Sequence, residues 1–290
     1  MKLNKHRAAL VTAMAIFGTI GIFRRYIPLP SGAVALCRAA LGVLFLLGVL
    51  LCRRQKLDFA AIRKNLLPLL LSGVFLGFNW VLLFEAYKYT SVAAATLSYY
   101  MAPILLILAA PLFLKERLTL KKGICAAVAL LGMVLVSGIL ETGVRGITEL
   151  RGILMGLCAA VLYAAIIIIN KRISGITAID KTVVQFAVSV VVLLPYVLLV
   201  EEVAPTALTP TATVLLLLVG VLHTGFAYAL YFGSVENLSA GIVALYSYID
   251  PVLAVVLSAV LLKEPMTSLG AVGAVFILGA ALLSEYQKKP

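Results

Sequence analysis

The second half of the chain repeats the first at a fixed offset of 148 residues. Aligned without gaps, residues 77–119 and 225–267 share 13 identities in 43 pairs, more than apolar composition alone should produce. The shared positions include Gly77 with Gly225, Ser91 with Ser239, Tyr100 with Tyr248, Pro103 with Pro251, and Lys115-Glu116 with Lys263-Glu264. We therefore predict two copies of one structural unit, residues 1–145 and residues 146–290.

The amino-acid composition indicates whether both copies lie in water or in a lipid bilayer. Apolar residues make up 63% of the chain, charged residues make up 12%, and the mean hydropathy is +1.13, whereas soluble domains are about 45–50% apolar and about 25% charged. The apolar runs have the length at which an α-helix crosses a bilayer, and the alternating pattern of a barrel is missing. The pattern predicts an all-α integral membrane protein with ten spans, at 8–23, 31–51, 66–87, 91–113, 121–139, 151–171, 180–200, 212–233, 239–261 and 268–285.

The loops carry an uneven charge. With the N terminus inside, 17 Lys and Arg residues fall in cytoplasmic segments and 6 in outer loops. Because positive charge favours the cytoplasmic side, we expect both termini in the cytoplasm. The expected location is the inner membrane of the cell. Five spans per copy is an odd number, which makes the copies inverted repeats. The net charge of +12 is explained by a basic face beside anionic lipid, without nucleic acid. Inverted repeats are typical of transporters, whose substrate site lies near the midplane.

Two sets of segments carry a family resemblance. In the first copy they are 87–93, 97–103 and 114–119, and in the second they are 235–240, 248–251 and 262–265. Their pattern, a helix, a proline, a second helix, an acidic residue and a threonine, resembles the EamA repeat of the drug/metabolite transporter superfamily over nearly the whole chain. The resemblance implies a ten-helix secondary transporter that works by alternating access, often an exporter of amino acids or other small metabolites. Thr119 and Thr267 are expected to cap the helices that follow them.

Three charged residues fall inside predicted spans: Arg38, Glu85 and Asp250. Charges held in hydrocarbon are kept there with a partner or for a use. Asp250 is the most central, and we interpret it as a carboxylate that binds a proton or a cation, or else as a structural acid. Arg38 and Glu85 form a structural ion pair, or Arg38 binds a substrate carboxylate or Glu85 a substrate amine. Glu85 is also a candidate for proton coupling. None of the three charges recurs at the aligned position of the other copy. The predicted substrate site therefore carries different charges on its two sides.

Further candidates lie on the same helices. His223 is placed at a depth similar to that of Asp250 and could pass protons to it, although a lone histidine also serves in packing. Trp80, Tyr99 and Tyr246 are predicted pocket walls, since aromatic rings attract cationic and amphipathic ligands. The two mid-span prolines, Pro103 and Pro251, bend their helices as hinges of alternating access or as fixed kinks.

The sequence carries no motif of an enzyme. It has no nucleophile and base pattern, no metal-ligand cluster and no phosphate loop, so we expect neither catalysis nor a cofactor nor a metal. The predicted function is export of a small amphipathic metabolite, foremost an amino acid, with proton coupling as an option. The alternatives are an organic-cation or drug exporter and a lipid flippase. The expected partners are a small-molecule substrate, protons and the lipid bilayer, and the chain is expected to be a monomer or a homodimer.

Overall fold

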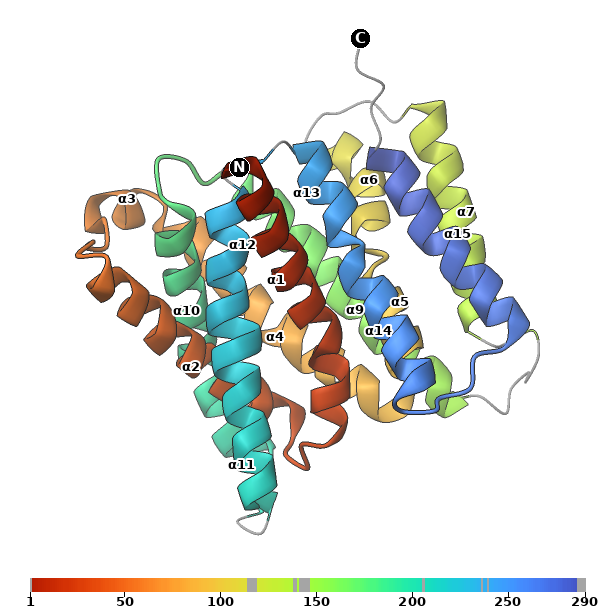
Figure 1. The fold of residues 1–290 in the computed structure, drawn as a ribbon, viewed down its shortest axis with the longest axis horizontal. Helices are drawn as coiled ribbons and strands as arrows, with labels where there is room; N and C mark the ends of the chain where they lie inside the picture. Colours follow the sequence, from red (N-terminus) through yellow and green to blue (C-terminus); the bar gives the residue numbers. More distant parts are fainter. Residues whose placement is uncertain are drawn as a thin grey trace.

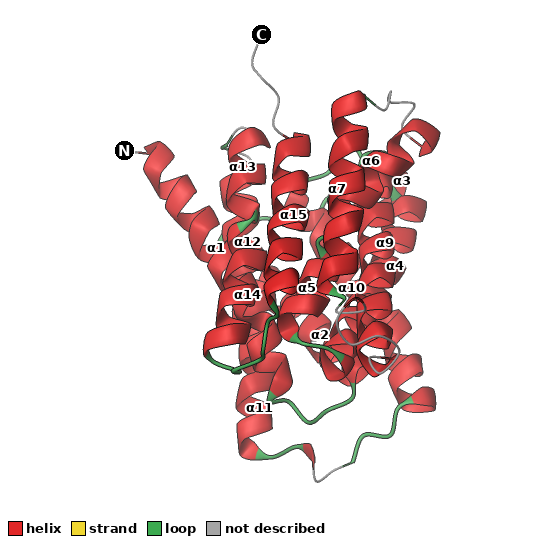
Figure 2. Cartoon of the chain, turned by 90° about the vertical axis from the view of Figure 1, so that its right-hand side faces the viewer, coloured by secondary structure: helices red, strands yellow, loops and turns green. Residues whose placement is uncertain are grey.

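A computed structural model describes residues 2–113, 119–137, 140, 147–204, 207–235, 237–238 and 240–285. Their secondary structure is helical, with no strand in these ranges (Figure 2). Lys115-Glu116, Ser239 and the predicted boundary between residues 145 and 146 lie outside the described residues.

The first half contains seven described helices, which Figure 1 shows in red to yellow-green. They are α1 (Lys2–Arg25), α2 (Ser31–Cys52), α3 (Phe59–Lys64), α4 (Leu66–Tyr89), α5 (Val92–Tyr99), α6 (Ala102–Phe113) and α7 (Leu120–Val136). The second half consists of α9 (Ile147–Asn170), α10 (Ala178–Val200), α11 (Pro210–Leu217), the π-helix η3 (Leu218–Phe226), α12 (Ala227–Val235), α13 (Ala240–Ser247), α14 (Ile249–Val260) and α15 (Ser268–Glu285).

Seven of the described helical segments are long and apolar enough to cross a membrane, by length and composition. One of them runs through α5 and α6, and another through α11, η3 and α12. The segments 245–260 and 268–284 are apolar but shorter. The start of α1 and the end of α15 lie at the same face of the bundle (Figure 1). We call the opposite face, where α1 ends and α2, α5 and α11 begin, the Arg25 face.

Both predicted threonine caps are confirmed. The Thr119 hydroxyl accepts a hydrogen bond from the backbone N–H of Lys122, and the Thr267 hydroxyl accepts one from Gly270. Such caps satisfy N–H groups that the first turn of a helix leaves without partners. They fix where α7 and α15 begin.

Two spans are broken at repeat-related positions. The first break separates α5 from α6 at Tyr100, and the second separates α13 from α14 at Tyr248 (Figure 1). A proline follows each break, Pro103 or Pro251, and it removes the N–H that a continuous helix would need there. The predicted bends therefore lie where the structure interrupts these spans.

Glycines bring several helices close together. A Cβ built on Gly73 of α4 would lie 2.7 Å from Val188 of α10, and one on Gly156 of α9 would lie 2.8 Å from Ser98 of α5. The pair α7 and α15, at one edge of the bundle in Figure 1, meets backbone to backbone, because a Cβ on Gly132 would lie 2.7 Å from a carbonyl of α15. Small residues at helix contacts are the usual means of packing inside a membrane.

Candidate functional site

Arg38 is a positively charged residue in the bundle interior. It lies on α2 and is buried, and its Nε donates a hydrogen bond to the Thr224 hydroxyl at 3.0 Å. The guanidinium carbon lies 4.0 Å from the ring centroid of Trp80 and 5.3 Å from that of Phe84. Stacking against aromatic faces stabilises a guanidinium away from water. Both aromatic residues come from α4, so α4 and η3 together fix the position of Arg38.

The π-helix explains why Thr224 faces Arg38. Its hydroxyl donates to the carbonyl of Val219, five residues back, at 2.9 Å, while it accepts from the arginine. Gly220 and Gly225 of the same segment allow α2 to approach, because a Cβ at either position would lie within 2.4 Å of a side-chain atom of Leu41 or Phe45. A π-helical turn inside an α-helical span is often found at a functional site. Thr224 was not among the predicted site residues, because its contact with Arg38 depends on this local helix geometry.

Asp250 is a partly buried acidic residue in the first turn of α14. The Tyr100 hydroxyl donates to its carboxylate at 2.6 Å. Tyr100 stands at the break between α5 and α6, and Asp250 follows the break between α13 and α14. The contact therefore joins the two interrupted spans at their interruptions. Tyr100 was not among the predicted site residues, although its repeat partner Tyr248 marked the position in the sequence.

Three tyrosines lie near both charges. Tyr87, Tyr99 and Tyr228 are each within electrostatic range of both Arg38 and Asp250. Tyr99, Tyr228 and Asp250 keep part of their surface accessible although they lie in the interior of the bundle. Arg38 and Asp250 form no ion pair with each other or with another described residue. We call Arg38, Trp80, Phe84, Tyr87, Tyr99, Tyr100, Thr224, Tyr228 and Asp250 the central cluster.

His223 lies beside the central cluster and is fully buried. Its Nε2 is 2.8 Å from the Thr19 hydroxyl, its Nδ1 is 3.2 Å from the carbonyl of Leu218, and its ring packs edge-on against Phe23. Both ring nitrogens thus have partners on α1 and η3. In the described part of the chain no hydrogen bond connects His223 to Asp250, so the structure places this histidine in packing and does not bring the two together as a relay.

Glu85 lies at the Arg25 face. Its carboxylate accepts a hydrogen bond from the Ser31 hydroxyl at 2.6 Å and pairs with the Lys88 ammonium at 2.7 Å. Arg24 binds the same Ser31 hydroxyl at 3.0 Å. The predicted alternative of an ion pair between Arg38 and Glu85 is therefore wrong, because Glu85 pairs with Lys88 and accepts from Ser31 at the Arg25 face.

The three aromatic residues predicted to line the pocket belong to two different groups of side chains. Trp80 and Tyr99 belong to the central cluster, and Tyr99 stacks near Tyr163 with ring centroids 5.4 Å apart. Tyr246 instead packs against an apolar group that contains Leu10 and Met14 of α1.

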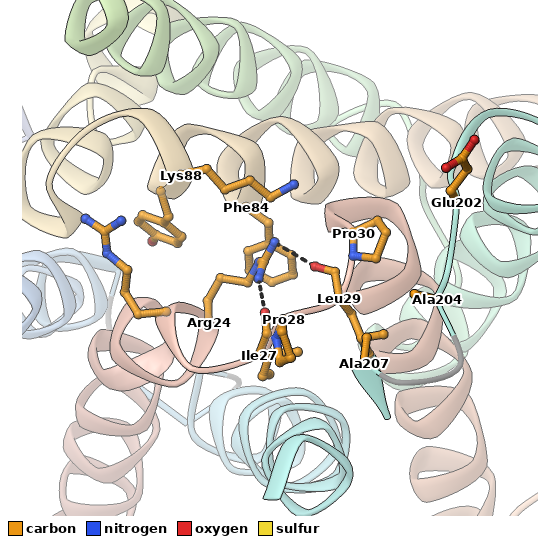
Figure 3. A pocket seen from close by; sticks show the side chains of 12 residues that line it. Arg24, Ile27, Pro28, Leu29, Pro30, Phe84, Lys88, Glu202, Ala204 and Ala207 are labelled. Carbon is orange, nitrogen blue, oxygen red and sulfur yellow. Dashed lines mark hydrogen bonds between the residues drawn. The ribbon is translucent and has the colours of Figure 1, made fainter. Parts of the chain in front are cut away.

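A cavity of about 430 Å³ opens at the Arg25 face. Its lining comprises Arg24, Arg25, Ile27, Pro28, Leu29, Pro30, Phe84, Tyr87, Lys88, Glu202, Ala204 and Ala207. Figure 3 shows Arg24 against Phe84, donating to the backbone carbonyls of Ile27 and Leu29. Phe84 and Tyr87 line this cavity and also belong to the central cluster, and the buried Phe84 ring lies against both Arg24 and Arg38.

Two carboxylates of the second half close the same face. Glu201, just after α10, accepts hydrogen bonds from the backbone N–H groups of Gly32 and Ala33 at the start of α2, both at 2.8 Å. Glu264, before α15, accepts one from Val92 at the start of α5 at 2.8 Å and pairs with Arg25. A carboxylate is stabilised at a helix N terminus by the free N–H groups and the helix dipole. We call these contacts the carboxylate bridges.

Among the described residues, no group of three or more His, Cys, Asp or Glu side chains is placed to hold a metal ion. The four cysteines are free.

Known proteins resemble the chain over most of its length. The EamA-like transporter family matches residues 7–138 and 150–286. The uncharacterised transporter YxxF of Bacillus subtilis is 32% identical over 253 residues, which cover 87% of this chain and 80% of the relative. The uncharacterised transporter YojE of the same organism is 25% identical over 80% of this chain and 75% of its own length.

A solved crystal structure shares the fold. It superposes with a TM-score of 0.67 over 97% of this chain and 96% of its own, at 18% identity. With the family matching both halves, and a relative this similar over most of the chain, the protein is a multi-pass membrane protein that belongs to the EamA-like transporter family.

Proposed function

We propose that this transporter exports a small zwitterionic metabolite, foremost an amino acid, through ten spans arranged as two inverted five-helix repeats, residues 1–145 and 146–290. The observation that carries the proposal is the central cluster, where a buried arginine and an aspartate face the same tyrosines without pairing with each other. A ligand with both charges would satisfy both residues. The export direction and the inner membrane, with both termini cytoplasmic, follow from the family resemblance and from the loop charges.

The chemistry of recognition follows from the side chains. Because the Arg38 Nε is held by Thr224, the two terminal nitrogens are left for a ligand carboxylate, which a guanidinium binds through two parallel hydrogen bonds. The Asp250 carboxylate attracts an ammonium group, and Tyr87, Tyr99 and Tyr228 supply aromatic contact between the two ends. An organic cation is the second candidate, supported by Asp250 and its tyrosines alone, but it would leave the buried charge of Arg38 without a counter-ion.

Asp250 is also the proposed proton carrier. The titratable and charged groups around it are Tyr100, which donates to it, the three tyrosines of the central cluster and, beyond them, Arg38. Only the ionised carboxylate attracts an ammonium, so protonation of Asp250 would release the ligand. The other candidates have partners elsewhere: Glu85 pairs with Lys88 at the Arg25 face, and His223 contacts the Thr19 hydroxyl of α1.

Alternating access is supported by the two broken spans and by the carboxylate bridges. Breaks at Tyr100 and Tyr248 let each half-helix move about Pro103 or Pro251. The bridges join the second half to the starts of α2 and α5 in the first half. We infer that opening the Arg25 face requires these bridges to separate.

Removing one bridge should loosen the Arg25 face. In Glu201→Ala the N–H groups of Gly32 and Ala33 lose a charged acceptor, which is worth about 1.5–3 kcal/mol, so their hydrogen exchange should accelerate about tenfold or more. Hydrogen–deuterium exchange of the purified protein measures this. Glu202→Ala is the matched control, because the neighbouring carboxylate lines the cavity without contacting a helix start. Equal exchange in the two variants would contradict the bridge.

The proposed function is tested in proteoliposomes. Vesicles that contain the protein should exchange a labelled amino acid saturably, and a panel of amino acids, decarboxylated amines and organic cations identifies the preferred class. A transmembrane pH difference should drive accumulation if Asp250 carries a proton. No movement of any of these solutes above empty vesicles would reject the proposal, whereas lipid scrambling without solute transport would favour a flippase.

A further inference from the structure

A second concave site lies on the flank of the bundle, away from the central cluster. It is a groove of about 310 Å³ between α4 and α9, lined by Leu82, Leu150, Arg151, Leu154, Met155 and Cys158. Leu154 is 52% exposed at its surface, while Leu82 and Met155 pack against the main apolar core. The groove is thus an apolar indentation whose base is continuous with the protein interior.

The groove has a charged end and an apolar end. Arg151 lies near the start of α9, with its guanidinium carbon 4.3 Å from the ring centroid of Tyr89, at the end of α4. Leu82 precedes Tyr89 by seven residues, and Cys158 follows Arg151 by seven. At about 1.5 Å per residue, the lining therefore extends about 10 Å from the arginine toward the middle of both helices. A tyrosine and an arginine at the apolar limit are typical of the membrane–water interface.

Arg151 is exposed and forms no ion pair with any residue that the structure describes. Its ring contact with Tyr89 orients the guanidinium beside the mouth of the groove. A guanidinium binds phosphate through paired, charge-assisted hydrogen bonds. A ligand that fits this site therefore combines a hydrocarbon chain, for the groove, with a phosphate group, for the arginine at its end.

We propose that this groove binds a phospholipid with an anionic headgroup. One acyl chain lies along Leu82, Leu154 and Met155, and the headgroup phosphate contacts Arg151. The acyl chain fills the indentation and contacts Leu82 and Met155, which pack against the apolar core on their other side. The bound lipid supports the contact between α4 and α9, and this role is independent of the transported solute.

The test compares phosphatidylglycerol with phosphatidylcholine of the same acyl chains, added to the full-length protein in detergent. Native mass spectrometry counts retained lipid, and thermal unfolding measures stabilisation. The wild type should retain phosphatidylglycerol about five-fold better, the factor expected of one arginine beside an anionic headgroup. Arg151→Gln should retain both lipids equally, and Leu154→Trp, which fills the groove, should retain less of both. Arg63→Gln, an exposed cation on α3, is the control and should keep the preference.

Three results would overturn the proposal. Retention of both lipids equally by the wild type would show that no headgroup is recognised. A preference that persists in Arg151→Gln would show that the headgroup is recognised elsewhere on the protein. If Leu154→Trp leaves lipid retention unchanged and converts a dimer into a monomer in size-exclusion chromatography, the groove is covered by a second copy of the chain. Neither readout involves transport, so failure here is separate from failure of the proposed function.

Discussion

Asp250→Asn should abolish recognition of the ligand amine while leaving the fold intact. Asparagine keeps an oxygen that can accept the hydrogen bond from Tyr100, so the midpoint of thermal unfolding should hardly change. The ammonium of a bound amino acid, however, loses its counter-charge. Loss of one partner of a buried charge pair typically costs about 2–5 kcal/mol, so the dissociation constant should rise about 30-fold or more. Isothermal titration calorimetry of the purified protein measures it.

The choice of ligand and pH separates this role from a general loss of affinity. A carboxylic acid that has the same side chain but lacks the amine should bind the wild type and Asp250→Asn equally. Wild-type affinity for the amino acid should fall as the pH is lowered and Asp250 becomes protonated, whereas the variant should show no such dependence. Tyr100→Phe is the matched control, because it removes the neighbouring hydroxyl and retains the carboxylate. An unchanged affinity in Asp250→Asn would make this residue a structural acid.

The sequence predicted an all-helical membrane protein because the bilayer restricts what a chain can do. Apolar runs of fixed length become helices, and the repeat-related prolines predicted bends in two spans that the structure interrupts after Tyr99 and Ser247. The caps at Thr119 and Thr267 followed from local backbone chemistry. These features depend on neighbours in the sequence, which is why pattern and spacing sufficed for them.

Contacts between helices were harder to predict, because a sequence gives the depth of a residue but not the rotation of its helix. Depth alone suggested a pairing of Arg38 with Glu85, yet α2 turns Arg38 toward Thr224 and Trp80, and Glu85 finds Lys88 one turn away on its own helix. The π-helical turn around Thr224 has no clear signature in the sequence. Glu201 was not a candidate either, because its partners are backbone N–H groups of a distant helix start.

Arg38→Gln should show the opposite selectivity to Asp250→Asn. The amino acid should bind about 30-fold more weakly or worse, since its carboxylate loses a charged partner in the interior, whereas the corresponding decarboxylated amine should bind as before or better. Arg38→Lys should recover only part of the affinity. A lysine keeps the charge, but it cannot present two parallel donors while it also stacks on Trp80 and bonds Thr224.

The physical reason for this selectivity is the state of Arg38 without ligand. Aromatic rings and one hydroxyl surround the buried guanidinium, and no described carboxylate pairs with it, so a ligand carboxylate supplies a counter-charge that the protein lacks. Thr224→Val is the matched control: it frees the Nε but leaves the charge, and should weaken binding less than Arg38→Gln. If Arg38→Gln weakens the amine and the amino acid equally, Arg38 supports the packing of α2 against α4, and the site recognises a cation through Asp250 alone.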